Sequence, residues 1–240
     1  LDYLEGLGEL QVIGGVLEVR APALGLRTRI PQADLRVRVD GGRVEAGAHA
    51  FIRPDQAPAE LAIRFDRQAG DGRAWAKLDT DAMGAWAPLL HHFGIAPAEG
   101  RGQAQAWAQL RGHRVVEVDS QFQWQDLLLS GAPLADGKLP QLRLEKLRGR
   151  TRWQAVDGGW RLDAPQLRIT DARGEQALDG LVVAGGERYA LLARELDASA
   201  LLAVAALADV LPESLRAWMN QAAPQARLTG VEVVGRRGGP

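Results

Sequence analysis

A two-residue rhythm of apolar side chains runs through most of this chain and limits what it can fold into. Leu35, Val37 and Val39 alternate with charged residues, and the same alternation returns at residues 61–65 and 142–145. Successive side chains of a strand point to opposite faces, so each segment has one apolar and one polar face. This pattern is typical of an antiparallel sheet with a single buried side.

Glycine pairs punctuate the alternation where hairpins are expected. Asp40-Gly41-Gly42 separates two alternating segments, and Asp157-Gly158-Gly159 lies between Trp153 and Trp160. Glycine reaches the positive φ angles that tight hairpin turns need at low cost. Both sites are therefore predicted to be turns between neighbouring antiparallel strands.

Two segments break the rhythm and resemble each other. In each, a strand ends in a Leu-Asp step, at Leu78-Asp79 and at Leu196-Asp197, and an Ala/Leu-rich stretch follows. Asp79 or Thr80, and Asp197, suit the N-cap position because a side-chain oxygen can accept the free amide hydrogens of the first turn.

A further short helix is predicted between two prolines. Pro212 suits the first turn of a helix, and Pro224 suits the position just after its end. The first of the three helices is expected to end near Gly94.

The repeated order of strands, short helix and strands predicts two similar units. The first covers residues 1–136 with a short helix near 81–93. The second covers residues 137–240 with short helices near 199–209 and 212–222. The boundary near Asp136-Gly137 has a second interpretation, a long loop inside one unit.

Composition excludes several classes of function. The net charge is −1, which gives no electrostatic reason to expect nucleic acid as a partner, and the chain has no cysteine for disulfides or thiolate metal sites. No apolar run approaches the roughly 20 residues that cross a bilayer. The chain begins at Leu1 and ends just after an expected strand, so we expect a segment whose anchor lies elsewhere.

A search for catalytic or metal-binding residues finds no convincing set. His91 and His92 are adjacent, so on a helix they point about 100° apart and chelate one ion poorly. Asp79 and Asp81 could be paired carboxylates, but capping explains their position better. No Gly-x-Ser-x-Gly elbow or nucleotide-binding loop is present. We therefore predict no enzymatic activity and no cofactor.

The scarcity of helices raises the question of what covers the apolar face of the sheet. Two or three short helices cannot cover a long sheet, so the sheet must curl, pack on a second sheet or hold something apolar. The predicted fold is mainly β: a long, curved antiparallel sheet forming a taco-like groove with two or three short capping helices.

The seven tryptophans can be interpreted as core residues or as the lining of a surface that receives acyl chains. The residues predicted to line the groove are Leu142, Leu144, Leu167, Ile169, Trp107 and Trp124.

Several longer motifs resemble the YhdP family of AsmA-like envelope proteins. They are Leu196-Asp197-Ala198-Ser199-Ala200-Leu201, the Leu211-Pro212-Glu213-Ser214 step, the return to strand at 224–228, and the hairpin over residues 147–162. Ala226 stands where the family usually has glycine. The resemblance is clearest between Leu142 and Val234.

The resemblance implies a segment, from the central region of the family's sequence, of a long protein. That protein would be anchored in the inner membrane and extend through the periplasm, with the anchor outside this segment. Family members resemble bridge-like lipid-transfer proteins, in which phospholipid acyl chains travel along a β-groove between inner and outer membrane. The implied partners are phospholipid or another acyl-chain lipid, the rest of the same chain and envelope proteins at either membrane. The family brings no catalytic residues.

Two other classes of function remain open from the residues alone. A ligand-free structural or interaction module of the envelope would show the same strand pattern with a filled core. A glycan-active enzyme would need two carboxylates about 5–10 Å apart in a cleft, and no pair in this sequence suggests that arrangement.

Overall fold

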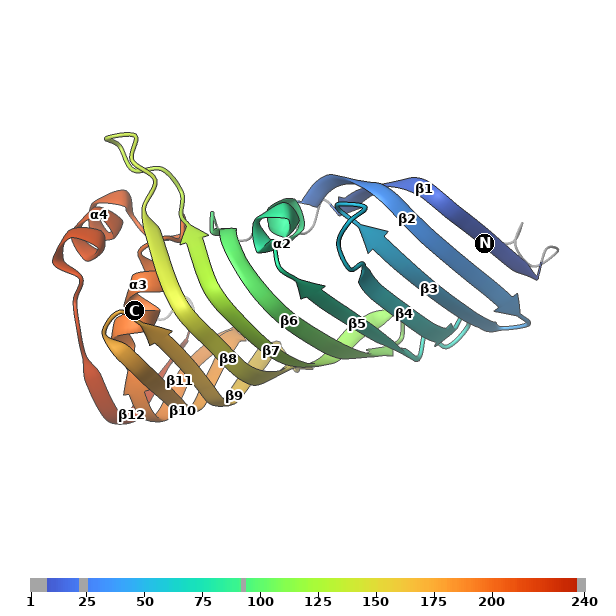
Figure 1. Cartoon of the computed structure of the whole chain (residues 1–240). Helices are drawn as coiled ribbons and strands as arrows, with labels where there is room; N and C mark the ends of the chain where they lie inside the picture. Colours follow the sequence, from blue (N-terminus) through green and yellow to red (C-terminus); the bar gives the residue numbers. More distant parts are fainter. Residues whose placement is uncertain (1–7, 22–25, 92–93, 237–240) are drawn as a thin grey trace. The chain divides into compact units, whose positions relative to one another are not determined.

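β-Strands dominate the computed structural model, which describes residues 8–21, 26–91 and 94–236 (Figure 1). The twelve described strands form one antiparallel sheet, and their order across it follows their order in the chain. The sheet is open, with β1 and β12 as its edges. The prediction of a mainly β chain with an open antiparallel sheet and short helices is confirmed.

The strands and helices have the following bounds. The strands are β1 (Glu9–Ala21), β2 (Leu26–Asp40), β3 (Arg43–Phe51), β4 (Ala59–Asp66), β5 (Gly72–Thr80), β6 (Ala96–Arg111), β7 (Arg114–Ser130), β8 (Gln141–Val156), β9 (Gly159–Asp171), β10 (Gly174–Gly186), β11 (Arg188–Asp197) and β12 (Arg227–Arg236). The helices are the 3₁₀ turn η2 (Met83–Trp86), α2 (Ala87–Leu90), α3 (Ala198–Ala205) and α4 (Glu213–Ala222).

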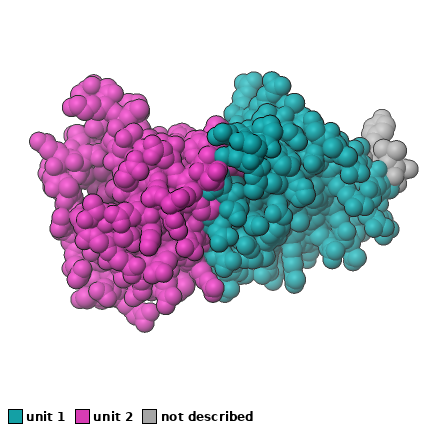
Figure 2. Space-filling model, in the orientation of Figure 1, with its two compact units in different colours: residues 1–80, 103–121, 152–155 teal, residues 81–102, 122–151, 156–240 magenta. Residues whose placement is uncertain are grey.

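Two compact units divide the chain, and strands β6 to β8 contribute to both (Figure 2). Unit 1 comprises residues 1–80, 103–121 and 152–155; unit 2 comprises residues 81–102, 122–151 and 156–240. The segment around Asp136-Gly137 is the connection between β7 and β8 and lies within unit 2. All the described helices belong to unit 2.

Glycines make the turns and the irregularity of unit 1. Asp40 pairs with Arg43 across a two-residue turn, in which Gly41 has φ +54°. In β1 the register with β2 shifts beside Gly14, whose φ is +65° and whose N–H donates to Asp34 Oδ1 at 2.8 Å. The local break at the Gly14-Gly15 pair is a β-bulge that re-aims the rest of the strand.

The helices of unit 2 begin and end at short signals in the sequence. Asp197 caps α3 by accepting a hydrogen bond from the Ser199 N–H at 3.1 Å, as predicted. Helix α4 begins directly after Pro212 and ends at Ala223, which has a left-handed φ of +43°. Pro224 follows and prevents continuation of the helix.

The predicted cap at Asp79 or Thr80 is wrong. Strand β5 continues through Thr80, and the first helical turn begins only at Met83, with Ala82 at the N-cap position and no side-chain hydrogen bond there. Strand pairing uses the backbone of residues 79 and 80 and moves the helix start further along the chain. Residues 92 and 93, the end of the predicted helix, lie outside the described residues.

The core of unit 2 forms where its helices meet the sheet. Helix α3 contacts α4 and β12, and Leu207, just after α3, is 1% exposed. The chain approaches closely there: a Cβ at Gly131 would lie 2.7 Å from the Leu207 carbonyl oxygen. Ala132 N–H donates to the same oxygen at 3.1 Å. The β7–β8 connection is thereby attached to the end of the helix.

Candidate functional site

The strands of unit 1 separate charged and apolar side chains onto opposite faces. Direct cross-strand partners share a face, and Glu45 of β3 is the partner of Arg38 on β2 and Arg64 on β4. One residue along, Ala46 is the partner of Val37 and Ile63. We call these the charged face and the apolar face of unit 1.

Among the described residues, unit 1 contributes no helix of its own to cover its apolar face. Its residues on β1 to β5 form rows of direct partners: Leu10, Val37, Ala46, Ile63 and Ala74 in one row, and Val12, Leu35, Ala48, Leu61 and Ala76 in the next. Most of these side chains are half-buried, while Val12 is 39% exposed and Leu61 is 48% exposed. A filled core would leave large aliphatic side chains almost inaccessible. This face therefore presents apolar surface that its own chain leaves partly open.

Unit 2 fills the corresponding surface near its helices. Leu178 of β10 is the direct partner of Leu167 on β9 and Leu196 on β11, and Leu178 and Leu196 are 0% and 3% exposed. Trp86 at the end of η2 and Met219 on α4 are buried as well. The short helices supply enough side chains to close the end of this unit.

The six residues predicted to line a groove are found in three kinds of surroundings. Leu144, Ile169 and Trp124 are buried in unit 2, with exposed fractions of 1%, 3% and 9%. Leu142 and Leu167 are half-buried. Trp107 is 42% exposed. It lies on the same face of β6 as Gln109, two residues further along, whose side-chain amide donates a hydrogen bond to Glu117 on β7.

A half-open hollow of about 390 Å³ lies beside the helices in unit 2, and Leu142 is part of its wall. Its other lining residues include Asp171, Arg173, Ser199 and Met219. Of the predicted residues, three thus lie in the core of unit 2, and Leu142 alone lines this hollow. Leu167 is half-buried opposite Leu178, and Trp107 is exposed on β6.

Two tryptophans occupy cores and others stand at the surface. Trp86 and Trp124 are buried in unit 2. Trp160 and Trp218 are 37% and 55% exposed. Core packing and surface exposure thus both occur among the tryptophans, and the reception of acyl chains by the exposed ones stays a prediction.

The sequence analysis left the apolar face of unit 1 out of the predicted lining. Its signal was present, because residues 35–39 and 61–65 carry the clearest alternation in the chain. The alternation alone does not indicate whether the helices cover the apolar surface of unit 1 or that of unit 2. Helix placement decides this, and the helices that the structure describes belong to unit 2.

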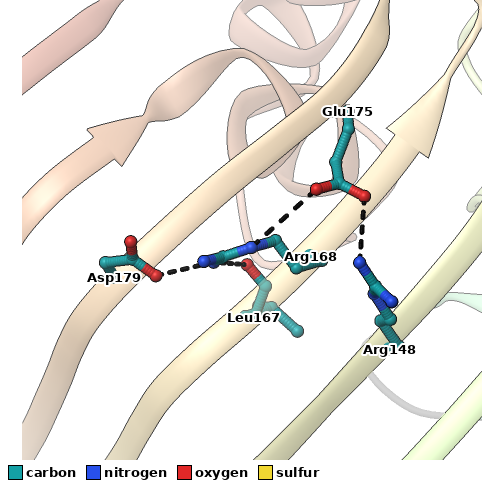
Figure 3. Close-up of polar contacts among 5 residues, drawn as sticks. All are labelled: Arg148, Leu167, Arg168, Glu175 and Asp179. Atoms are coloured by element: carbon teal, nitrogen blue, oxygen red, sulfur yellow. Dashed lines mark hydrogen bonds and ion pairs between the residues drawn. The ribbon is translucent and has the colours of Figure 1, made fainter.

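In unit 2, side chains of β8, β9 and β10 form a network of ion pairs (Figure 3). Arg168 Nη1 lies 2.6 Å from Asp179 Oδ1, and Arg148 Nη2 lies 3.2 Å from Glu175 Oε2. The hydrogen bond to Asp179 raises the pKa of Arg168 above its ordinary value. Each arginine has an acidic partner nearby, so this patch is electrostatically balanced.

Unit 2 also holds two buried charged residues that serve packing. Asp171 is 6% exposed. Its carboxylate accepts one hydrogen bond from the backbone N–H of Arg173 at 2.8 Å and another from Nε of the same arginine at 2.9 Å. Arg216 of α4 is 5% exposed and donates to the carbonyl oxygen of Ala132. These bonds tie the β9–β10 turn and the β7–β8 connection to the core.

Groupings typical of metal sites are not found among the described residues. No cluster of three or more His, Asp or Glu side chains able to hold a metal ion occurs in the described ranges. His49 is exposed on β3, and His113 Nε2 lies 3.0 Å from the carbonyl oxygen of Arg67 at a turn. His91 ends α2, while His92 lies outside the described residues.

None of the described helices combines the length and apolar character needed to span a bilayer.

Comparison with known proteins gives one match. The family model described as YhdP protein matches residues 16–237. No curated protein and no solved structure matches the chain significantly. The matched range contains the motifs over residues 147–162 and 196–228 that resemble this family. Since the match covers nearly the whole chain, the chain belongs to the YhdP family.

Proposed function

We propose that this chain is a segment of a bridge-like lipid-transfer protein, and that the apolar face of unit 1 receives the acyl chains of phospholipids. The observation that carries the proposal is the partly open apolar face of β1 to β5, on which Leu61 is 48% exposed. Membership of the YhdP family supports the proposal at the level of the protein class.

The side-chain sizes on this face suit a chain of methylene groups. Alanines on β3 and β5 alternate with larger residues on β2 and β4: Ala46 lies between Val37 and Ile63, and Ala48 lies between Leu35 and Leu61. Neighbouring strands lie about 4.8 Å apart, so the larger residues of β2 and β4 are separated by roughly 10 Å. Their small neighbour leaves room between them for apolar matter.

Burial of acyl chains supplies enough free energy for binding without polar contacts. Each methylene group removed from water contributes about 0.8 kcal/mol. The apolar face has no fixed donor or acceptor along the two rows, so it would accept acyl chains with little discrimination among headgroups. Such tolerance suits transport of bulk phospholipid.

The rest of the proposal follows from the family. The chain would work in the periplasm of a Gram-negative cell, as part of a protein anchored in the inner membrane outside this segment. Its partners would be phospholipid, the rest of the same chain and envelope proteins at either membrane. We propose no catalytic activity and no cofactor.

A structural role is the second candidate, and the filled core of unit 2 favours it for that part of the chain. Leu144, Ile169 and Trp124 are buried among protein atoms there. In this alternative the segment would be a spacer of the envelope, and lipid would bind neither unit.

The test is equilibrium binding of a fluorescent phospholipid to the purified chain. Ile63→Asp places a charge on the apolar face and is expected to weaken binding at least tenfold, because the carboxylate must be desolvated when a chain covers it. Ala62→Asp, on the charged face of the same strand and directly opposite the uncharged residues Gly47 and Trp75, is the matched control and should bind normally. Absence of binding to the unmutated, folded chain, or equal loss in both variants, would favour the structural role.

A further inference from the structure

A second hollow lies on the opposite, charged face of unit 1. It has a volume of about 560 Å³, and seven of its ten lining residues, Gly47 and Ala62 among them, belong to the charged face by their strand alternation. The other three are Ala46, Ile63 and Ala74, which lie between them along the strands. Its walls carry four arginines and one glutamate, namely Arg36, Arg38, Arg64, Arg73 and Glu45. Because this hollow and the apolar face are on opposite sides of the same strands, an inference about the hollow does not depend on the proposed lipid binding.

The charges around the hollow follow the sheet register. Glu9, Arg38, Glu45 and Arg64 are successive direct partners across β1 to β4, so negative and positive charges alternate along the row. On β5 the alternation fails, because the partner of Arg64 is Arg73. Like charges placed directly opposite each other destabilise a sheet. The row therefore ends in two neighbouring cations.

The acidic residues near the hollow already have strong partners. Glu9 receives two hydrogen bonds from Arg36, at 2.9 and 3.0 Å, and this pairing lowers the pKa of Glu9. Glu45 Oε1 lies 2.7 Å from Arg64 Nε. Within the described residues no carboxylate lies at ion-pair distance from Arg38 or Arg73. The hollow thus has excess positive charge.

We propose that this hollow binds a phosphate group. A guanidinium presents its N–H donors in a planar fork that matches the oxygens of phosphate, and several arginines around one hollow are a common arrangement for recognising it. Gly47 and Ala62 have little or no side chain, so a phosphate can approach the sheet between the arginines. An anion beside Arg64 and Arg73 also offsets their mutual repulsion.

The phosphate could belong to a soluble ester or to a lipid headgroup presented by a bilayer. Both sources offer the same oxygens to the arginines. The experiment therefore has a soluble arm with glycerol 3-phosphate and a bilayer arm with phosphatidylglycerol vesicles, compared with phosphatidylcholine vesicles as the uncharged surface.

The test compares two double variants of the full chain with equal net charge. Arg38→Gln with Arg73→Gln removes the two arginines of the hollow that have no carboxylate at ion-pair distance within the described residues. Arg114→Gln with Arg150→Gln, at exposed positions outside the hollow, is the control. Binding is measured by titration at constant ionic strength, with chloride as the reference anion. In at least one arm the first variant is expected to bind at least tenfold more weakly than the unmutated chain, and the control is expected to bind normally.

A single variant separates the site from general loss of charge or folding. Arg73→Glu restores the alternation of charges along the row, so in phosphate-free buffer it should raise the midpoint of thermal unfolding while abolishing phosphate binding. Lack of phosphate-specific binding in both arms, or equal weakening in the two double variants, would overturn the proposal. Binding of fluorescent phospholipid acyl chains should survive in all these variants, which distinguishes this site from the apolar face.

Discussion

Leu61 of β4 lies directly opposite Ala76 of β5, and although both belong to the apolar face of unit 1, Leu61 remains 48% exposed. In unit 2, Leu178 lies directly opposite Leu196 and is completely buried. The same alternating pattern thus produces an open surface in one unit and a filled core in the other. The difference comes from the helices, all of which belong to unit 2 where the structure describes the chain.

The first prediction uses this contrast. Leu178→Ala should lower the free energy of unfolding by about 2–5 kcal/mol, because it leaves a cavity among buried side chains. Leu61→Ala should cost less than about 1 kcal/mol, since solvent already reaches that side chain. Denaturant unfolding followed by circular dichroism measures both. Equal costs would mean that the apolar face of unit 1 is packed shut.

The second prediction concerns the close approach at Gly131. Gly131→Ala brings a Cβ to 2.7 Å from the Leu207 carbonyl oxygen, so backbone must move, and we expect a loss of about 1–3 kcal/mol in unfolding free energy. Gly47→Ala is the matched control: its Cβ would meet no atom nearer than 3.8 Å. The midpoint of thermal unfolding should fall only for the first variant. An unchanged midpoint in Gly131→Ala would show that the β7–β8 connection does not hold to α3.

The third prediction is a dependence of stability on pH through Asp171. Burial alone would raise the pKa of this carboxyl group, but the hydrogen bonds from Arg173 outweigh burial, so the pKa lies below its ordinary value. A lowered pKa in the folded state contributes stability above the unfolded value of about 3.9, and that stability is lost as the pH falls through the folded pKa.

Asp171→Asn should therefore be less stable than the unmutated chain at pH 7, by about 1–3 kcal/mol. The difference between the two should shrink steadily as the pH is lowered below about 4. Denaturant unfolding at a series of pH values measures this difference. A gap that stays constant down to the acid limit of folding would contradict the assignment.

Much of the fold can be predicted from the sequence because local signals agree with tertiary pairing. The alternation at residues 35–39 and 61–65 defines the two faces, and Asp40-Gly41-Gly42 fixes a hairpin turn. Asp197 caps α3 because its side chain meets a free amide hydrogen. The same reasoning fails at Asp79, where strand pairing continues past the potential cap.

Other features depend on contacts that no short stretch of sequence reveals. Trp124 and Leu127 are three residues apart in β7, yet both are buried. Between them Asp126 has a φ of +51°, which breaks the two-residue alternation, and its carboxylate lies 2.9 Å from Arg101. An aspartate in the sequence does not by itself indicate a left-handed backbone conformation. This break in the alternation of β7 is therefore visible only in the structure. The location of the open apolar face also depends on where the helices pack.

The central claim is that acyl chains lie on the apolar face of unit 1, and site-specific photo-crosslinking tests it most directly. A photoreactive amino acid is placed at Leu61, or at neighbouring Glu60 on the charged face, and the folded chain is irradiated with phospholipid vesicles. We expect a phospholipid adduct, identified by mass spectrometry, at position 61 and little at position 60. No adduct at 61, or equal yields at the two positions, would contradict the account.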